Sequence, residues 1–232
     1  MIKRIPFESL HVSSQGWLES RFHFSFAQYH NPQNMNFGVL RVMNDDVIAP
    51  HTGFGMHPHR DMEIFTYVLE GELTHEDSMG NKETLKAGDI QYLSAGTGIY
   101  HSEKNEGEMP VHLIQTWIVP HTKGLTPRYG SYKRDTALRH NKWQHLFGTD
   151  NGRAVIGLYQ DTNVYAIEQD KDEKSEFILE NGRQAYLKVM EGSIILNGIP
   201  LAFGDSAEIM DEIIEIKASS DAHLLLIEMS IN

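Results

Sequence analysis

Two short segments carry imidazole and carboxylate side chains two residues apart. One pairs His57 with His59, and the other pairs His101 with Glu103. In an extended strand, residues two apart point to the same face with Cβ atoms roughly 6 to 7 Å apart, so both side chains can reach one ion. Two such pairs on neighbouring strands would supply four ligands to a single metal. Pro58 cannot donate to a sheet, which predicts an edge strand, a strand start or a bulge there.

Three neutral nitrogens and one carboxylate oxygen predict the class of metal. Such a set suits Fe, Mn, Co, Ni, Cu or Zn, and it disfavours Mg and Ca, which prefer oxygen. Six-coordinate iron held this way keeps two open positions, as a reactive site needs and a structural metal does not. The alternative interpretation is a surface loop without metal. We favour the metal site because imidazole and charged groups inside a barrel are costly unless they are paired or metal-bound.

The composition narrows the remaining choices. The 232 residues include no cysteine, which excludes disulfides and thiolate ligands, and they carry a formal net charge of −12. No cluster of Lys and Arg is present, so we expect no direct binding to nucleic acid. No apolar run is long enough for a signal peptide or a membrane span, and a cytoplasmic protein is therefore expected.

Short apolar and β-branched segments bounded by Gly, Pro, Asn or Asp recur along the chain and predict an all-β sandwich or barrel. They cover residues 37–47, 62–69, 89–94, 111–119, 155–158, 185–190 and 224–229. Gly80-Asn81 and Asn197-Gly198 predict hairpin turns.

The two hairpins belong to an internal repeat. Residues 67–93 parallel residues 188–209, with Leu-Glu-Gly at 69–71 matching Met-Glu-Gly at 190–192, and Ala-Gly-Asp at 87–89 matching Phe-Gly-Asp at 203–205. We therefore expect two similar β-domains, with a boundary in the polar stretch 127–142. The histidines flank only the first copy. A purely structural role would favour histidines in both copies, so this asymmetry favours a site.

These motifs together resemble the cupin superfamily, and within it the pirin-like proteins. The resemblance covers nearly the whole chain, and its most specific parts are the segments HPHRDME and HSE, which begin at His57 and His101. It implies two tandem cupin barrels of the jelly-roll, or double-stranded β-helix, type. Residues 1–133 would form the metal-binding N-terminal domain, and residues 134–232 would form a C-terminal domain without metal ligands.

The resemblance also implies the ligands, which are His57, His59, His101 and Glu103, and one divalent ion. Fe(II) is our first choice, with Mn, Ni, Co, Cu or Zn as alternatives. Glu63 lies one residue too far from Gly71 to match the general cupin ligand, so we interpret it as a structural or outer hydrogen-bond acceptor and as a candidate to orient an imidazole. His75 is expected to be solvated or to pack near a hairpin. His51 could line the approach to the barrel, although its spacing does not require it.

The activity implied by the resemblance is that of a quercetin 2,3-dioxygenase, which acts on a small aromatic flavonol and dioxygen. Glu103 would be the catalytic base that takes the proton of the flavonol 3-hydroxyl. Phe22, Phe24, Phe26 and Trp17 are interpreted first as packing residues and second as walls of an aromatic pocket. Eukaryotic pirins supply the alternative function, a metal-dependent regulatory module that binds a protein partner. A different cupin reaction, such as isomerisation, is a third hypothesis.

Overall fold

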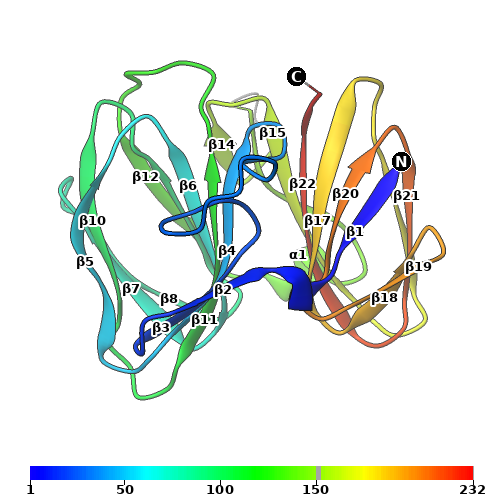
Figure 1. The fold of residues 1–232 in the computed structure, drawn as a ribbon, viewed down its shortest axis with the longest axis horizontal. Coiled ribbons are helices and arrows are strands. Elements are labelled where there is room, and N and C mark those ends of the chain that lie inside the picture. Colours follow the sequence, from blue (N-terminus) through cyan, green and yellow to red (C-terminus); the bar gives the residue numbers. More distant parts are fainter. Residues whose placement is uncertain (150–152, 232) are drawn as a thin grey trace. The chain divides into compact units, whose positions relative to one another are not determined.

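The computed structural model describes residues 1–149 and 153–231 and groups them in two units, one of residues 11–134 and one of residues 1–10, 135–149 and 153–231. The strands of the first unit, seen in Figure 1, are β2 (His11–Ser14), β3 (Leu18–Phe22), β4 (Leu40–Ile48), β5 (Thr52–His59), β6 (Glu63–Glu70), β7 (Glu72–Asp77), β8 (Lys82–Lys86), β9 (Ile90–Ser94), β10 (Ile99–Asn105), β11 (Val111–Ile118) and β12 (Arg128–Tyr132). They form a seven-stranded sheet, ordered β12-β9-β6-β11-β4-β3-β2, and a four-stranded sheet, ordered β5-β10-β7-β8.

The apolar core of the first unit joins its two sheets. Ile48 and Val68 from the larger sheet and Leu73 and Leu85 from the smaller one are each fully buried in one cluster. Because side chains alternate between the faces of a strand, each sheet turns one apolar face toward the other. The result is a barrel of two facing sheets, as the resemblance implies.

The second unit repeats this arrangement. Its elements are β1 (Ile2–Ile5), a 3-10 turn (Phe7–Ser9), α1 (Thr136–Arg139), β13 (Gln144–Thr149), β14 (Ile156–Leu158), β15 (Thr162–Gln169), β16 (Lys174–Ile178), β17 (Arg183–Glu191), β18 (Ser193–Leu196), β19 (Ile199–Ala202), β20 (Ser206–Met210), β21 (Ile213–Ala218) and β22 (Ala222–Ser230). Its larger sheet has the order β1-β20-β17-β22-β15-β13-β14, and its smaller sheet the order β16-β21-β18-β19. The predicted all-β class and the two barrels are confirmed.

Both predicted hairpins form. Gly80 and Asn81 lie between β7 and β8, which pair antiparallel. Asn197 and Gly198 join β18 to β19 with φ angles of 45° and 83°. Two consecutive positive φ angles are what a tight two-residue hairpin requires, and Asn-Gly adopts them with little strain.

The first ten residues differ from the expected domain assignment, which placed residues 1–133 together. Strand β1 pairs antiparallel with β20, so that Ile2 lies opposite Ile209, and residues 1–10 group with the C-terminal barrel. Ile2 packs against that barrel's apolar core. In the part of the chain that the structure describes, no helix has the length and hydropathy to span a bilayer.

Candidate metal centre

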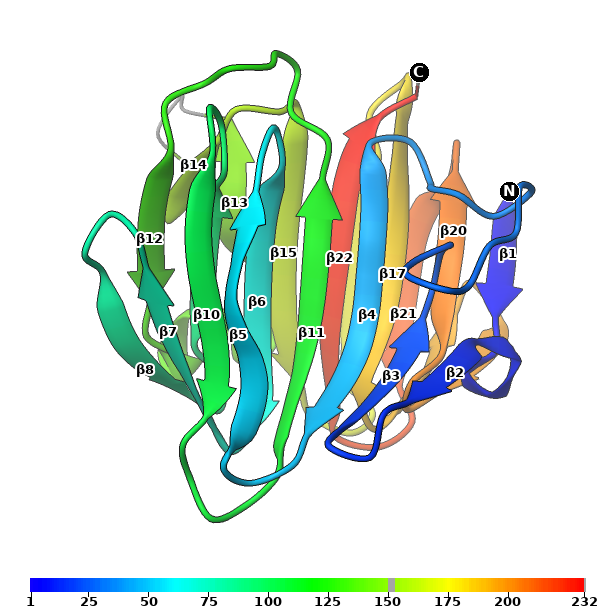
Figure 2. The ribbon, with the colours of Figure 1, turned by 60° about the vertical axis from the view of Figure 1, so that its left-hand side comes forward.

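Strand β10 lies between β5 and β7 in the smaller sheet of the first unit, as Figure 2 shows, and carries two of the predicted site residues. His101 lies opposite His57 of β5, and Glu103 lies opposite His75 of β7. Directly opposed residues in an antiparallel pair share a face and have Cβ atoms about 4.5 to 5.5 Å apart. The two flanking strands therefore bring their histidines to β10 from opposite sides.

Strand β5 is irregular where it supplies its histidines. It is an edge strand, which is one of the placements predicted for Pro58. The three residues of β10 from His101 to Glu103 face four residues of β5, from His57 to Phe54, so β5 contains a bulge. The bulge lets Phe54 turn into the core while His57 still points toward His101.

The three predicted histidines come together. Their ring centroids are 4.5 Å apart for His57 and His101, 4.8 Å for His59 and His101, and 4.8 Å for His57 and His59. One ligand nitrogen from each lies within 4.8 Å of the others. Nδ1 of His57 is 2.7 Å from the carbonyl oxygen of Gly55, so Nδ1 donates and Nε2 keeps the lone pair that a metal needs.

Burial keeps two of these imidazoles neutral. The pKa of His59 and the pKa of His101 are each lowered to about 3. Desolvation is the largest cause, and repulsion from neighbouring histidines is the second. Both rings are therefore uncharged at neutral pH, which is the form that binds a metal. Neither ring nitrogen of His101 has a hydrogen-bond partner among the described residues, although both are buried. Unpaired buried nitrogens are costly, and a transition metal would satisfy one of them.

Glu103 is almost completely buried and is fixed by hydrogen bonds from neighbouring strands. Its Oε1 accepts from Nε2 of Gln91 and, at 3.0 Å, from Oγ1 of Thr66. Its Oε2 accepts from Nε2 of Gln115 at 2.6 Å. An ionised carboxylate has about four acceptor sites, so these three bonds leave room for one more partner.

The ligand atoms of the four predicted ligands do not all lie within the same short distance of one another. His57, His59 and His101 form one set of potential metal ligands, whereas Glu103 forms a second set with His101 and His75. Within each set the ligand atoms lie within 4.8 Å of one another. Both sets belong to the first unit and share His101, so the structure adds His75 to the residues found from the sequence.

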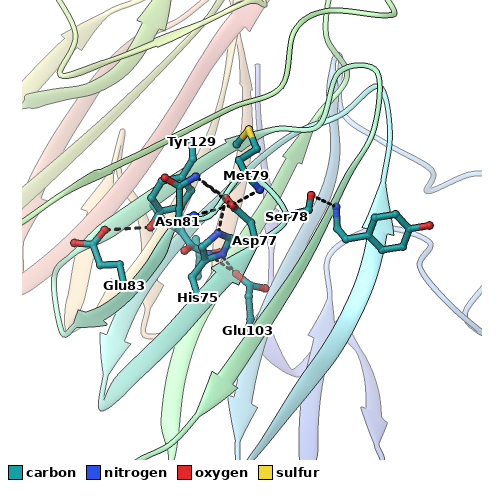
Figure 3. A network of polar contacts seen from close by, with 11 residues as sticks. His75, Asp77, Ser78, Met79, Asn81, Glu83, Glu103 and Tyr129 are labelled. Atoms are coloured by element: carbon teal, nitrogen blue, oxygen red, sulfur yellow. Dashed lines mark hydrogen bonds and ion pairs between the residues drawn. The ribbon is translucent and has the colours of Figure 1, made fainter.

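Of the two roles expected for His75, solvated or packing, the structure excludes the solvated one. Its side chain is buried and its Nε2 lies 3.2 Å from Oδ2 of Asp77, whose side chain is buried too. The ring stacks on Tyr129, with centroids 4.6 Å apart. Figure 3 shows His75 between Asp77 and Glu103. The His-x-Asp spacing on a predicted strand was the signal that could have revealed this pair, since both residues point to one face.

Asp77 is held as a charged acceptor. Its Oδ1 accepts the backbone N–H groups of Met79 and Asn81 at 2.9 and 3.1 Å, and the Asn81 amide donates to both of its oxygens. Burial raises the pKa of Asp77, but the bonds from Asn81, His75 and Met79 outweigh burial and lower it below its usual range. The carboxylate therefore accepts a hydrogen bond from Nε2–H of His75.

The other candidate residues surround this centre. Glu63 is fully buried and accepts a hydrogen bond from the Tyr92 hydroxyl at 2.6 Å. Phe26 packs edge-on against Trp117, and Trp117 packs edge-on against His59, with centroids 5.4 and 4.8 Å apart. His51 is exposed and lies 3.2 Å from Glu108. The aromatic side chains therefore lie next to the histidines, while His51 lines an open hollow of about 550 Å³ beside β5.

Phe22, Phe24 and Trp17 show the packing role that was expected first. Phe22 and Phe24 are buried, and Phe22 packs edge-on against Phe26. Trp17 packs against the core cluster and contacts Phe54.

Comparison with known proteins agrees with this architecture. A family model described as Pirin matches residues 7–118, and one described as the quercetinase C-terminal cupin domain matches residues 146–229. A quercetin 2,3-dioxygenase of Escherichia coli K12 is 43% identical over 219 residues, which are 94% of each chain. A pirin-like protein of Caulobacter vibrioides is 42% identical over 230 residues, covering 98% of this chain and 99% of its own length.

A solved structure extends the likeness to three dimensions. The crystal structure of the bacterial pirin YhhW of Escherichia coli in complex with nickel(II) superposes with a TM-score of 0.94, at 40% identity and with both chains fully covered. The sequence relatives, the two family models and the paired jelly-roll barrels lead to the same assignment. This chain belongs to the pirin family of two-domain cupin proteins.

Proposed function

We propose that this protein is a metal-dependent flavonol dioxygenase of the quercetin 2,3-dioxygenase type. The observation that carries the proposal is the convergence of three buried or half-buried imidazoles beside Glu103, a buried carboxylate on the central strand β10. The donor set suits a divalent first-row transition metal. The names of the relatives and the nickel complex of YhhW support the same class of protein.

We assign His57, His59, His101 and Glu103 to hold the ion, with Fe(II) as the first choice and Ni, Mn, Co, Cu or Zn as alternatives. When bound, the metal would supply Lewis acidity and redox chemistry toward dioxygen. Nitrogen and oxygen ligands of this kind do not by themselves decide which of these ions is bound, because the bound ion depends both on its affinity for the site and on its availability in the cell. Metal analysis of freshly purified protein is the direct measurement.

The residues of the barrel divide the remaining work. Glu103 is the proposed proton acceptor for the 3-hydroxyl of the flavonol, and the bonds from Thr66, Gln91 and Gln115 fix its position. Since these bonds leave one acceptor site, Glu103 would use that site either for the ion or for the substrate proton. Trp117 offers an aromatic surface beside His59 against which a flavonol ring could pack.

Oxygen uptake by metal-loaded protein with quercetin tests the reaction. We expect uptake to depend on the flavonol and to fall at least a hundredfold in His57→Ala and His101→Ala, since each removes a ligand. A loaded, folded wild-type protein that consumes no oxygen with any flavonol would contradict the proposal. If the same protein captured a partner in a metal-dependent way, the regulatory alternative would be favoured, for which the net charge of −12 would fit a basic partner.

A further inference from the structure

His75 has the features of a metal ligand rather than of a packing residue. Metal-bound histidines commonly donate their second N–H to a carboxylate, which fixes the tautomer and the ring plane. In this barrel Nε2–H of His75 donates a hydrogen bond to Asp77, so the lone pair of the neutral ring is on Nδ1. Nδ1 is buried and has no hydrogen-bond partner among the described residues.

The surroundings hold this nitrogen in place. His75 is 0% exposed, and its ring is stacked on Tyr129 at an interplanar angle of 14°. The Tyr129 hydroxyl donates to Glu83 at 3.1 Å, so the stacking ring is itself anchored. Ligand atoms of His75, His101 and Glu103 lie within 4.8 Å of one another. Burying a fixed hydrogen-bond acceptor without a donor costs free energy of folding unless a ligand satisfies the acceptor.

The second barrel shows that the scaffold does not require these polar residues. Four residues after the repeated Gly71 comes His75, and four residues after its counterpart Gly192 comes Leu196. Just as His75 lies opposite Glu103 on the central strand, Leu196 lies opposite Ile216. Leu196 and Ile216 are both buried in the apolar core of their unit. The same cross-strand position is thus filled by an apolar pair where no ligand chemistry is needed.

We propose that the N-terminal barrel offers one metal ion two positions that share His101. The first, the three-histidine position, uses His57 and His59 with His101. The second, the His75 position, uses His75 and Glu103 with His101. The two are alternatives for one ion, because a neutral imidazole such as His101 has only one ring nitrogen with a lone pair free for a metal. This proposal rests on the proposed metal centre but not on the flavonol reaction.

The two positions place the ion differently with respect to Glu103. In the His75 position the carboxylate is a ligand, so its one remaining acceptor site is occupied. In the three-histidine position Glu103 is outside the close set and keeps that site for a substrate proton. Movement of the ion between the two positions would then release Glu103, which reconciles its proposed roles as ligand and as base.

Cobalt(II) binding to full-length variants tests the His75 position. The double variant His57→Ala/His59→Ala lacks two of the three histidines of the first position. We expect it to bind one Co²⁺ per chain in calorimetric titration, more weakly than wild type. Its crystals soaked in Co²⁺ should show an anomalous peak among His75, His101 and Glu103. Adding His75→Leu, the residue type of the second barrel, should weaken binding at least about tenfold further.

The control replaces the exposed His30 by Ala in the same double variant and should leave Co²⁺ binding unchanged. Circular dichroism in EDTA checks that each variant is folded. If an alanine or leucine variant does not fold, His57→Gln/His59→Gln and His75→Gln replace it, since glutamine keeps a donor for Asp77. A folded double variant that binds no Co²⁺, a peak elsewhere, or binding indifferent to His75 would overturn the proposal.

This outcome is separate from that of the proposed reaction. Failure of the wild-type protein to consume oxygen with flavonols would refute the activity, while the position of the ion in the crystals would stand. Conversely, active wild-type protein together with a double variant that lacks Co²⁺ would refute only the His75 position.

Discussion

Glu103 and His75 lie directly opposite each other on neighbouring strands, and both side chains are buried. A cross-strand pair of a carboxylate and an imidazole inside a barrel departs from the apolar pairs that fill most β-barrel cores. His101, two residues before Glu103, connects this pair to the histidines of β5. The centre is therefore organised around β10, with one histidine-bearing strand on each side.

Replacing His101 should be more damaging to metal binding than replacing either histidine of β5. His101 belongs to both potential ligand sets, so His101→Ala removes a ligand from each. We expect purified His101→Ala to contain almost no metal by elemental analysis, while His57→Ala keeps a measurable fraction. Equal metal content in the two variants would contradict the central role of His101.

Gln115 is expected to act through Glu103. Its amide donates to Oε2 of Glu103, and its carbonyl oxygen accepts from Nε1 of Trp117 at 3.2 Å. Hydrogen bonds to charged groups contribute about 1.5 to 3 kcal/mol. Gln115→Leu should therefore lower flavonol-dependent oxygen uptake roughly 10- to 100-fold while metal content stays near one per chain. The variant Gln115→Glu would bring two carboxylates together and should lower uptake further than Gln115→Leu does.

Asp46 should make the stability of the protein depend on pH. Its pKa is raised to about 7, mainly by burial. The charges of Asp45 and Glu103 add to this rise, while the hydrogen bond from Ser20 and the charge of His112 oppose it. Below about pH 4 Asp46 is protonated whether the chain is folded or not. As the pH rises from about 4 to 7 only the unfolded chain ionises, so stability falls by up to about 4 kcal/mol.

The side chain of the variant Asp46→Asn cannot ionise, so the variant should not show this fall in stability with rising pH. We expect the difference in the free energy of unfolding between variant and wild type to grow in favour of the variant from pH 4.5 to pH 8, measured by urea denaturation in EDTA. The exposed Glu106, replaced by Gln, is the control and should show no such trend. A difference that stays constant with pH would mean that Asp46 is ionised in the folded protein.

Gly53 should be irreplaceable at the contact between β5 and β10. Its φ is 150°, and an added Cβ would overlap the carbonyl oxygen of Glu103. We expect Gly53→Ala to cost about 2 to 4 kcal/mol of stability and to weaken metal binding, because β5 must shift and carry His57 with it. Gly55→Ala, where nothing lies within 4 Å of the new Cβ, is the matched control. Similar melting temperatures for both variants would contradict this account.

Much of this architecture could be predicted from local patterns. Alternating apolar segments, the Asn197-Gly198 turn and the repeated Glu-Gly motif depend on short stretches of sequence, so they indicated strands, hairpins and duplication correctly. The pairing of β5 with β10 followed from two motifs that each place side chains on one face. These features are encoded within a few residues, where periodicity and turn chemistry act directly.

Other features depend on partners distant in sequence and could not be predicted. Strand β1 joins β20, about 200 residues later, and no local signal identifies that partner. His75 was expected near a hairpin, which it is, but its burial depends on Tyr129 and on the facing strand β10. Glu63 was expected to be a hydrogen-bond acceptor, and it accepts from the hydroxyl of Tyr92, a partner that its own segment does not reveal. Side-chain partners of this kind are set by tertiary packing.

The apolar pair of Leu196 and Ile216 makes the C-terminal barrel an internal reference for the cost of burying polar side chains. Each half combines a seven-stranded sheet with a four-stranded one, so what distinguishes them is mainly the chemistry inside. Amide exchange in residues 135–149 and 153–231 should not change when a chelator is added, whereas exchange in residues 11–134 should become faster when the metal ion is removed. A duplicated fold would thereby allow the N-terminal barrel to carry the proposed metal site at the expense of rigidity, while the C-terminal barrel keeps an apolar core.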